Sequence, residues 1–241
     1  MTEILDVHSH ILPGIDDGAP SGKMSVEMLR TASEQGIRRI IATPHYSAFF
    51  QNTDPGRIRG LCRGLNRKAV KEGIPCRVYP GQEIMYSENA LERLNRGELL
   101  TMAGSRYILI EFEPSVPYSF IYMAIRNCAT QGYSPILAHV ERYRSVYAPG
   151  KAQELIGQGA HLQMNFRSIV GRWNDDTARW CRKMLKQKNI HFLGTDMHNM
   201  TTRTPDVTRP LKWIERHLEA DYSEQILWKN AAMILADKKI Q

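Results

Sequence analysis

Asp6-Val7-His8-Ser9-His10-Ile11-Leu12-Pro13-Gly14-Ile15-Asp16-Asp17-Gly18 lies near the start of the chain and contains its most informative residues. The apolar residues on either side of Asp6 predict a short buried strand over 4–7, followed by His8 and His10. Side chains two residues apart on a strand point the same way, so these two imidazoles can bind one metal ion. The turn at Pro13-Gly14 and the glycine after Asp17 allow the loop to fold back and bring a carboxylate to the pair.

Metal-ligand residue types follow short apolar runs at several further places in the sequence. These places are Pro44-His45, Gly81-Gln82-Glu83, Glu111-Phe112-Glu113, Ala138-His139 and Thr195-Asp196-Met197-His198. Five of the eight histidines lie at such points or in the opening stretch: His8, His10, His45, His139 and His198. A single His-x-His is a weak signal, and surface histidines in a polar turn are its simpler interpretation. The repetition favours one shared metal site.

Strand-like and helical segments alternate about seven times along the chain. Strands are predicted over 4–7, 39–42, 76–79, 107–112, 135–138, 160–165 and 191–194. Helices are predicted over 25–35, 55–72, 89–94, 120–131, 151–158, 173–188, 208–218 and 223–236. Asp54 as N-cap and Pro55 at the first helical position mark the start of the second helix.

This alternation favours parallel strands joined by helical crossovers. Candidate ligands follow the strands in nearly every unit, and in a (β/α) barrel these points converge on one rim, where active sites lie. An open doubly wound sheet is the alternative. It would not easily bring ligands from the first and the last strand together.

Length and composition are those of a globular protein, and we expect a single domain over residues 1–241. The formal charge of +7 favours acidic partners, although solubility alone could account for it. The amino terminus lacks a basic leader with a long apolar run, and no segment has the length of a membrane span. We therefore expect a cytoplasmic protein without membrane insertion. The tryptophans are spaced for helix packing, so no nucleic-acid partner is expected.

The four cysteines argue against one class of enzyme. They are far apart and form no Cys-x-x-Cys pair, so reduced buried thiols are expected. A cysteine-dependent tyrosine phosphatase needs an arginine six residues after its nucleophile. The residues at that distance here are Lys68, Gln82, Ser134 and Gln187. A phosphotyrosine substrate would therefore need a different nucleophile.

These motifs resemble those of the PHP (polymerase and histidinol phosphatase) superfamily of metal-dependent phosphoesterases. The chain is most similar to its branch of bacterial manganese-dependent protein-tyrosine phosphatases from capsule and exopolysaccharide loci. His-Ser-His-Ile-Leu-Pro-Gly-Ile-Asp-Asp-Gly is close to the signature of that branch, and Ala42-Thr43-Pro44-His45 matches its second motif. The resemblance extends from Asp6 to the segment 230–235. It implies a distorted (β/α)7 barrel, with which the number of units agrees.

The candidate metal ligands are His8, His10, Asp17, His45, Glu83, Glu111, His139, Asp196 and His198. They are too many for one ion, and their mixture of imidazole and carboxylate suits manganese, iron or zinc. The resemblance implies three ions, with manganese preferred. His8, His10, Glu83 and Asp196 would hold the first. Glu83 would bridge to a second held by Glu111 and His139, and Asp17, His45 and His198 would hold the third.

Such a cluster solves two problems of phosphomonoester hydrolysis. It lowers the pKa of bound water from about 15.7 towards 7, and it neutralises charge on the phosphoryl oxygens. The resulting hydroxide would attack phosphorus in line with the leaving oxygen. Because a tyrosine leaving group has a pKa of about 10, a strong general acid is less necessary than for an alkoxide. Asp196 and His198 are predicted to belong to this catalytic centre as well as to the ligand set.

Two arginines stand where the family has phosphate-binding arginines. Arg142 follows His139 by three residues and Arg203 follows His198 by five. Their planar guanidinium groups are expected to clamp phosphoryl oxygens, although a surface salt bridge would explain each of them equally simply.

Several neighbouring residues have open roles. Asp16 competes with Asp17 for one ligand position, and the motif favours Asp17. Asp6 is expected to orient a ligand histidine or to cap a turn, and Glu113 to lie on the surface. Tyr118, Tyr122 and Tyr143 could line a substrate pocket or serve in packing. His161, His191 and His217 are expected to pack or to lie on the surface rather than to bind metal.

Three functions remain in competition. The preferred one is a metal-dependent protein-tyrosine phosphatase, for which the resemblance implies a substrate in the tail of a membrane-associated bacterial tyrosine autokinase that controls polysaccharide synthesis. The second is another PHP phosphoesterase, such as a histidinol-phosphate phosphatase or a nuclease. The third is a metal-bound regulatory module without catalysis, which the nearly complete ligand set makes the weakest of the three.

Overall fold

The computed structural model describes residues 3–47, 54–172 and 174–240. The strands in this part of the chain are β1 (Ile4–Ser9), β2 (Ile37–Ala42), β3 (His45–Tyr46), β4 (Arg77–Pro80), β5 (Glu83–Met85), β6 (Tyr107–Glu111), β7 (Ser134–Leu137), β8 (His161–Asn165) and β9 (Phe192–Gly194). The helices are α1 (Gly22–Glu34), α2 (Pro55–Lys71), α3 (Glu88–Asn95), α4 (Tyr118–Thr130), α5 (Lys151–Gly157), α6 (Asp176–Lys186), α7 (Thr208–His217), α8 (Ala220–Glu224) and α9 (Asn230–Leu235).

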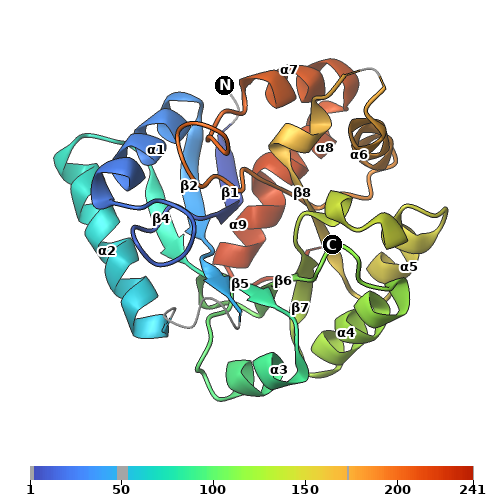
Figure 1. Cartoon of the computed structure of the whole chain (residues 1–241). Helices are drawn as coiled ribbons and strands as arrows, with labels where there is room; N and C mark the ends of the chain where they lie inside the picture. Colours follow the sequence, from blue (N-terminus) through green and yellow to red (C-terminus); the bar gives the residue numbers. More distant parts are fainter. Residues whose placement is uncertain (1–2, 48–53, 173, 241) are drawn as a thin grey trace.

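The strands curl into a distorted parallel barrel (Figure 1). All pairings between these strands are parallel, in the orders β1-β2-β4 and β3-β5-β6-β7-β8-β9. β3 continues the path of β2 after a break at Thr43-Pro44, and β5 continues β4 after Gly81-Gln82. Counting each broken pair as one strand gives seven barrel positions in the described part of the chain, as the resemblance implies.

The first and last strands meet where the barrel closes. Ser9 and Met197 form a parallel bridge, and the His10 amide donates to the Met197 carbonyl at 2.9 Å. Buried Asp6 accepts hydrogen bonds from the Thr195 hydroxyl at 2.6 Å and from the Thr195 amide at 2.9 Å. The barrel, rather than the open sheet, therefore brings together residues from both ends of the chain.

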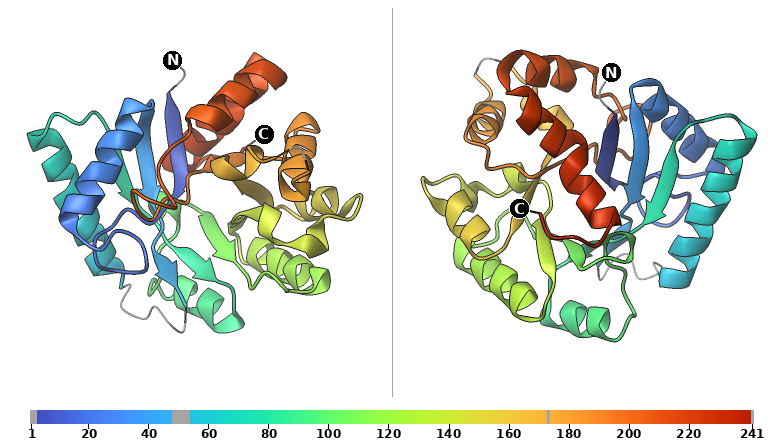
Figure 2. Two further views of the ribbon diagram at one scale, coloured as in Figure 1. Left: turned by 45° about the horizontal axis from the view of Figure 1, so that its top comes forward. Right: turned by 180° about the vertical axis from the view of Figure 1, so that it is seen from behind.

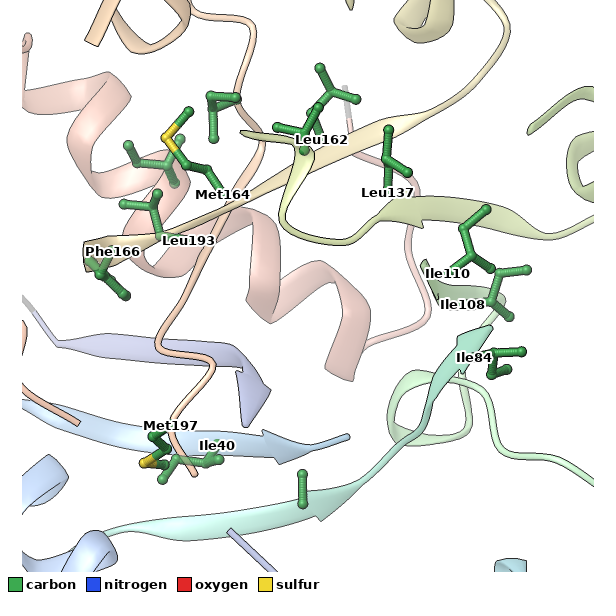
Figure 3. Close-up of a cluster of buried hydrophobic side chains, with 14 of the residues drawn as sticks. Ile40, Ile84, Ile108, Ile110, Leu137, Leu162, Met164, Phe166, Leu193 and Met197 are labelled. Atoms are coloured by element: carbon green, nitrogen blue, oxygen red, sulfur yellow. The ribbon is translucent and has the colours of Figure 1, made fainter. Parts of the chain in front are cut away.

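The helices surround the barrel, and one large apolar core lies between the two layers (Figures 1 and 2). Ile84, Leu137 and Leu162 point outward from their strands toward this layer (Figure 3). These side chains alternate with inward-facing residues because successive side chains of a strand point to opposite faces.

A second, smaller core fills the end of the barrel opposite the ligand residues. Leu5, Val7 and Tyr107 of the strands pack there with Ala231 and Ile234 of α9. Seen from behind, α9 lies across this end (Figure 2). The Tyr107 hydroxyl donates to the Lys238 carbonyl at 2.8 Å, which ties the carboxyl-terminal segment to β6. Because this smaller core is apolar, the polar candidate ligands lie at the other end of the barrel.

Most of the predicted elements are present, with shifted ends. Helix α2 begins at Pro55 with the Asp54 side chain capping it, as predicted. The prediction missed β3 and β5, and it ended the first strand two residues early, since β1 includes His8 and Ser9. The predicted helix 223–236 begins earlier, at Ala220, and contains a π-helical turn at Gln225–Lys229 between α8 and α9. Residue 173, the predicted start of α6, lies outside the described residues.

The described residues contain no helix that combines the length and the apolar character needed to cross a membrane. The four cysteines are buried and unbonded to one another, as expected.

Candidate metal centre

Candidate ligands extend from nearly every strand of the barrel at its carboxyl end. His8 lies in β1 and His10 follows it, while His45, Glu83 and Glu111 lie in β3, β5 and β6. His139 follows β7, and Asp196 and His198 follow β9. Because the strands are parallel, these ends meet at one mouth of the barrel.

One group of ligand atoms gathers around Glu83 and Asp196. The Nε2 atoms of His8 and His10 lie 3.1 and 3.2 Å from Oε2 of Glu83. The same two nitrogens lie 3.6 and 3.5 Å from Oδ1 of Asp196. All four side chains are buried, and they are the residues that the resemblance assigns to the first ion.

A second group contains Glu83, Glu111 and two histidines. Oε1 of Glu83 is 2.8 Å from Nε2 of His139, which is also 3.5 Å from Oε2 of Glu111. Nδ1 of His45 lies 2.9 Å from Oε1 of Glu111 and 3.1 Å from Oε2 of Glu83. Glu83 therefore contacts four histidines and lies between the first and second groups, where a bridging ligand belongs.

The third group lies on the solvent side of the mouth. Oδ1 of Asp17 is 3.5 Å from Nε2 of His45 and 3.4 Å from Nε2 of His198. His10 has a ligand atom within 4.8 Å of those of the other three residues. His45 thus faces the second group with one ring nitrogen and the third with the other, so the assignment of His45 and His10 to single ions stays a prediction.

Neighbouring oxygens determine which ring nitrogen of His8 and of His10 is free. Oε1 of Gln163 accepts from the His139 amide at 2.7 Å and lies 3.0 Å from Nδ1 of His8. An oxygen facing Nδ1 of His8 requires a proton on that nitrogen and leaves Nε2 as the ligand atom. Oδ2 of Asp16 acts in the same way on Nδ1 of His10 at 2.8 Å.

The donor set fits metal ions. The Nε2 atoms of His8 and His10 are only 3.2 Å apart, and in the neutral rings the oxygens beside each Nδ1 leave the lone pair of each ring on Nε2. Two lone pairs at this distance repel each other unless a cation lies between or near them. Within the described residues, Nε2 of His198 and Oε2 of Glu83 are buried without a hydrogen bond. Unsatisfied buried donors and acceptors of this kind are costly, and bound cations would satisfy them.

The electrostatics point the same way. Burial alone would raise the pKa of Glu83, but the charge of His8 and the nearby ring nitrogens of His10 and His139 hold that pKa well below its usual value. Burial opposes protonation of His10, yet the carboxylate of Asp16 outweighs it and raises the pKa of His10 to about 9. Burial and the charge of His10 lower the pKa of His198 to about 4. The buried carboxylates of the site are therefore stabilised by nearby positive charge, which divalent ions would supply in place of protons.

Two candidate ligands occupy strained backbone conformations. His139 and Asp196 have positive φ values of 32° and 52°. Residues other than glycine adopt such angles at a cost that the surrounding structure must offset, and they are concentrated at functional sites. Gly18 is required here for another reason, because a Cβ at this position would lie 2.1 Å from the His10 carbonyl oxygen.

Three arginines converge on Asp196 from the mouth of the barrel. Nη2 of Arg142 lies 2.6 Å from Oδ2, and Nη2 of Arg203 bonds Oδ1. Nη2 of Arg167 lies 3.5 Å from Oδ2. The two predicted arginines therefore pair with a candidate ligand, and within the described residues they form no other salt bridge. Arg167 was not predicted.

The two neighbouring carboxylates of the first loop have different contacts in the structure. Asp17 belongs to the third group, whereas Asp16 holds His10. Asp6 accepts hydrogen bonds from Thr195, directly after β9. Glu113 is exposed, as expected. Tyr143 is buried with its hydroxyl 3.3 Å from Nδ1 of His139, which makes it a neighbour of a ligand and not a wall of an open pocket.

The other aromatic and histidine residues lie outside the centre. The Tyr118 hydroxyl bonds Glu154 at 2.8 Å, between α4 and α5. His161 and His191 pack against each other, and His217 stacks on Trp213. None of these three histidines belongs to a candidate metal group in the described part of the chain.

Sequence reasoning missed Gln163, Asn165 and Arg167. All three come from β8 or the turn after it, at every second position, and face the mouth. The alternation of Leu162, Met164 and Phe166 in the outer core was a usable signal for this inward face. Uncharged amides are seldom singled out as site residues, because their usual role in a strand is ordinary hydrogen bonding.

The sequence of this chain matches a known family over nearly its whole length. The profile described as "Capsular polysaccharide synthesis, CpsB/CapC" matches residues 4–236. The chain belongs to the CpsB/CapC family. This confirms the resemblance to the capsule-locus branch of the PHP phosphoesterases.

Relatives of the chain are named as tyrosine-protein phosphatases. The chain is 33% identical to the tyrosine-protein phosphatase YwqE of Bacillus subtilis, over 98% of this chain and 93% of that protein. It is 28% identical to the tyrosine-protein phosphatase CpsB of Streptococcus agalactiae, over 98% of this chain and all of that one. A crystal structure from a study of YwqE and of CpsB from Streptococcus pneumoniae, described as unique metal-dependent tyrosine phosphatases, superposes with a TM-score of 0.91 at 33% identity. It covers 99% of this chain and 96% of that one.

The role of Gln163 can be tested through metal affinity. Replacing Gln163 with alanine removes the acceptor that fixes the His8 tautomer, so Mn²⁺ binding is expected to weaken by about 10- to 100-fold. A competition titration against a chelator measures this change. Gln153, an exposed glutamine of α5, provides the matched control Gln153→Ala. Equal affinity in both variants would show that Gln163 does not orient a ligand.

Proposed function

We propose that this chain hydrolyses phosphotyrosine in a protein substrate and that the nine predicted ligands hold the catalytic metal ions. The enzyme is a metal-dependent tyrosine-protein phosphatase of the CpsB/CapC family. The position of the His8 and His10 Nε2 atoms, each within 3.6 Å of an oxygen of Glu83 and of an oxygen of Asp196, supports the metal assignment most strongly. Manganese is the preferred ion, with iron and zinc as alternatives, and three is the proposed number.

Divalent ions bound there would supply hydroxide at neutral pH and offset the negative charge of the phosphoryl oxygens. The protein's own residues have other tasks. Gln163 and Asp16 hold His8 and His10 with Nε2 toward the centre. Arg142 and Arg203 present guanidinium groups to the phosphoryl oxygens from the solvent side. Because the phenolic leaving group has a pKa of about 10, the site can work without a dedicated general acid.

The proposed substrate is a phosphotyrosine in the tail of a membrane-associated bacterial tyrosine kinase, which links the enzyme to capsule or exopolysaccharide synthesis. The family description and the names of the relatives support this choice. We propose a cytoplasmic enzyme, in agreement with its four buried free cysteines.

A substrate panel tests the proposal. Phosphotyrosine peptide, histidinol phosphate and single-stranded DNA are offered to the Mn²⁺-loaded enzyme, and kcat/KM is compared. We expect phosphotyrosine peptide to be preferred by at least tenfold. Preference for histidinol phosphate or DNA would assign the enzyme to another PHP activity, and no metal-dependent turnover on any of the three would indicate a regulatory module.

The basic face of α2 is expected to favour acidic protein substrates. The helix contains no acidic residue, and Arg59, Arg63 and Arg67 are exposed without an ion pair in the described structure. Arg57 donates to the Gly14 carbonyl at 2.8 Å, which joins the start of α2 to the loop that carries Asp17. A substrate segment next to the phosphotyrosine could therefore extend along this helix.

Charge reversal tests this docking. The triple variant Arg59→Glu, Arg63→Glu, Arg67→Glu is expected to raise KM for an acidic phosphotyrosine peptide by about tenfold, because each exposed ion pair contributes a few tenths of a kcal/mol or more. KM for p-nitrophenyl phosphate should not change. Arg209→Glu, Lys212→Glu, Arg216→Glu on α7 makes the same change of charge and is the control. Equal effects of the two triple variants would show that α2 contributes only to the net charge of the protein and does not dock the peptide.

A further inference from the structure

Asp196 has more cationic neighbours than its oxygens can satisfy. Oδ2 accepts from Nη2 of Arg142 at 2.6 Å and from Nδ2 of Asn165 at 2.8 Å. A carboxylate oxygen offers two lone-pair sites, so these two donors fill it. Nη2 of Arg167 approaches the same oxygen only to 3.5 Å. Of the three arginines around Asp196, Arg167 is thus the one whose contact with the carboxylate is weakest.

Arg167 is also the most exposed of the three. Its side chain is 43% exposed, compared with 33% for Arg142 and 25% for Arg203. Asp196 is the one ion-pair partner of the Arg167 guanidinium within the described residues. The charges of Arg142 and Arg203 repel that of Arg167. Asp196 and Glu141 attract it, but Asp196 is already bonded to both other arginines, and Glu141 forms no ion pair with Arg167 in the described structure. A third guanidinium here is therefore poorly compensated by the protein alone.

The backbone places Arg167 at the mouth by the same alternation that places Gln163 and Asn165. Leu162, Met164 and Phe166 face the outer core (Figure 3). Gln163 and Asn165 face inward, and Gln163 donates to Asn165 at 3.0 Å. Ser168 bonds the buried carboxylate of Glu141 at 2.8 Å and holds the turn that carries Arg167. Arg167 is therefore set in position by a fixed backbone and is not a random surface arginine.

We propose that Arg167 is a third phosphoryl-binding residue, which joins Arg142 and Arg203 in holding the phosphoryl group of the substrate and the phosphate product. This inference rests on the proposed phosphatase function. A phosphate monoester carries about two negative charges near neutral pH and offers three terminal oxygens. It supplies the anionic charge and the acceptor sites that Asp196 lacks for three guanidinium groups. Planar guanidinium groups are suited to bonding such oxygens in pairs.

The experiment uses the Mn²⁺-loaded full chain and two readouts. Isothermal titration measures the Kd of inorganic phosphate, and steady-state kinetics measure KM and kcat for p-nitrophenyl phosphate, which has no peptide flanks. Arg167→Ala is expected to weaken phosphate binding and to raise KM by about tenfold, as the loss of one charge-assisted hydrogen bond predicts. Arg167→Lys should retain part of the binding. The metal content of both variants should equal that of the unaltered protein.

Arg172→Ala provides the control, because Arg172 is an exposed arginine five residues further along the same segment. Unchanged phosphate Kd and KM in Arg167→Ala would overturn the proposal, and so would a loss of bound metal that accounts for the change. An effect confined to acidic peptides, with p-nitrophenyl phosphate unaffected, would also overturn it, since Arg167 would then contact a flanking carboxylate. Because phosphate is the product of any phosphomonoesterase, the titration remains decisive for Arg167 even if phosphotyrosine is not the substrate.

Discussion

Replacing Glu83 with glutamine is expected to lower kcat/KM for a phosphotyrosine peptide by about a thousandfold or more, together with loss of bound metal. Glu83 contacts four histidines: His139 at 2.8 Å, His8 and His45 at 3.1 Å, and His10 at 3.2 Å. It lies between two ligand groups, so a neutral amide there removes a charge from both. Losing about 4 kcal/mol of the transition-state stabilisation that metal ions provide corresponds to this factor.

Metal analysis and steady-state kinetics on the same preparation measure the effect. Glu113→Gln is the matched control, because Glu113 is an exposed carboxylate two residues beyond the candidate ligand Glu111. Its metal content and kcat/KM should equal those of the unaltered protein. A Glu83→Gln enzyme with full metal content and activity would contradict the assignment of Glu83 as a bridging ligand.

Substituting alanine for Arg142 or Arg203 is expected to lower kcat/KM by about a hundredfold without loss of metal. Both guanidinium groups bond Asp196 and reach it from the solvent side, where the phosphoryl group would enter. A preorganised donor aimed at charge that develops in the transition state typically contributes about 10²- to 10³-fold. Steady-state kinetics with p-nitrophenyl phosphate and metal analysis separate this effect from damage to the metal site.

Arg126→Ala, which alters an exposed arginine of α4, serves as the control for both variants. Full activity in both Arg142→Ala and Arg203→Ala would show that these arginines do not clamp the phosphoryl group. Loss of metal in proportion to loss of activity would instead assign the two arginines to the structural support of Asp196.

The fold was predictable because the sequence marks it locally. Segment 107–110 is a continuous apolar run that ends at a candidate ligand, and Asp54-Pro55 is an explicit helix start, so the regular elements could be placed within a few residues. β3 and β5 could not be predicted, because strands of two and three residues are too short to show an alternating pattern. Their positions depend on the barrel itself, which continues β2 and β4 past a break.

The candidate site was predictable to the extent that it consists of histidines and acids placed after strands. The spacing of His8 and His10 together with the repeated ligand types after apolar runs predicted a shared site, whereas the grouping with Glu83 and Glu111 came from the family resemblance. The division of labour between Asp16 and Asp17 depends on a turn whose geometry is set by Gly18 packing on His10. The sequence alone does not distinguish which of two neighbouring carboxylates in such a loop faces the site, because the direction of each side chain depends on the turn.

The residues that support the ligands were the hardest to foresee. Gln163 acts on two histidines at once, through a ring nitrogen of His8 and the backbone amide of His139. Arg167 was singled out by its contact with Asp196, which is 29 residues away along the chain. Contacts between distant segments of this kind arise from barrel closure and leave no local pattern.

The most direct test of the metal-dependent mechanism is to measure bound metal and phosphotyrosine-peptide turnover in one preparation, before chelation, after chelation and after Mn²⁺ is restored. We expect more than one divalent ion per chain at the start, turnover that falls to background when the ions are removed, and recovery when Mn²⁺ returns. Undiminished turnover by a fully metal-free protein would contradict the account.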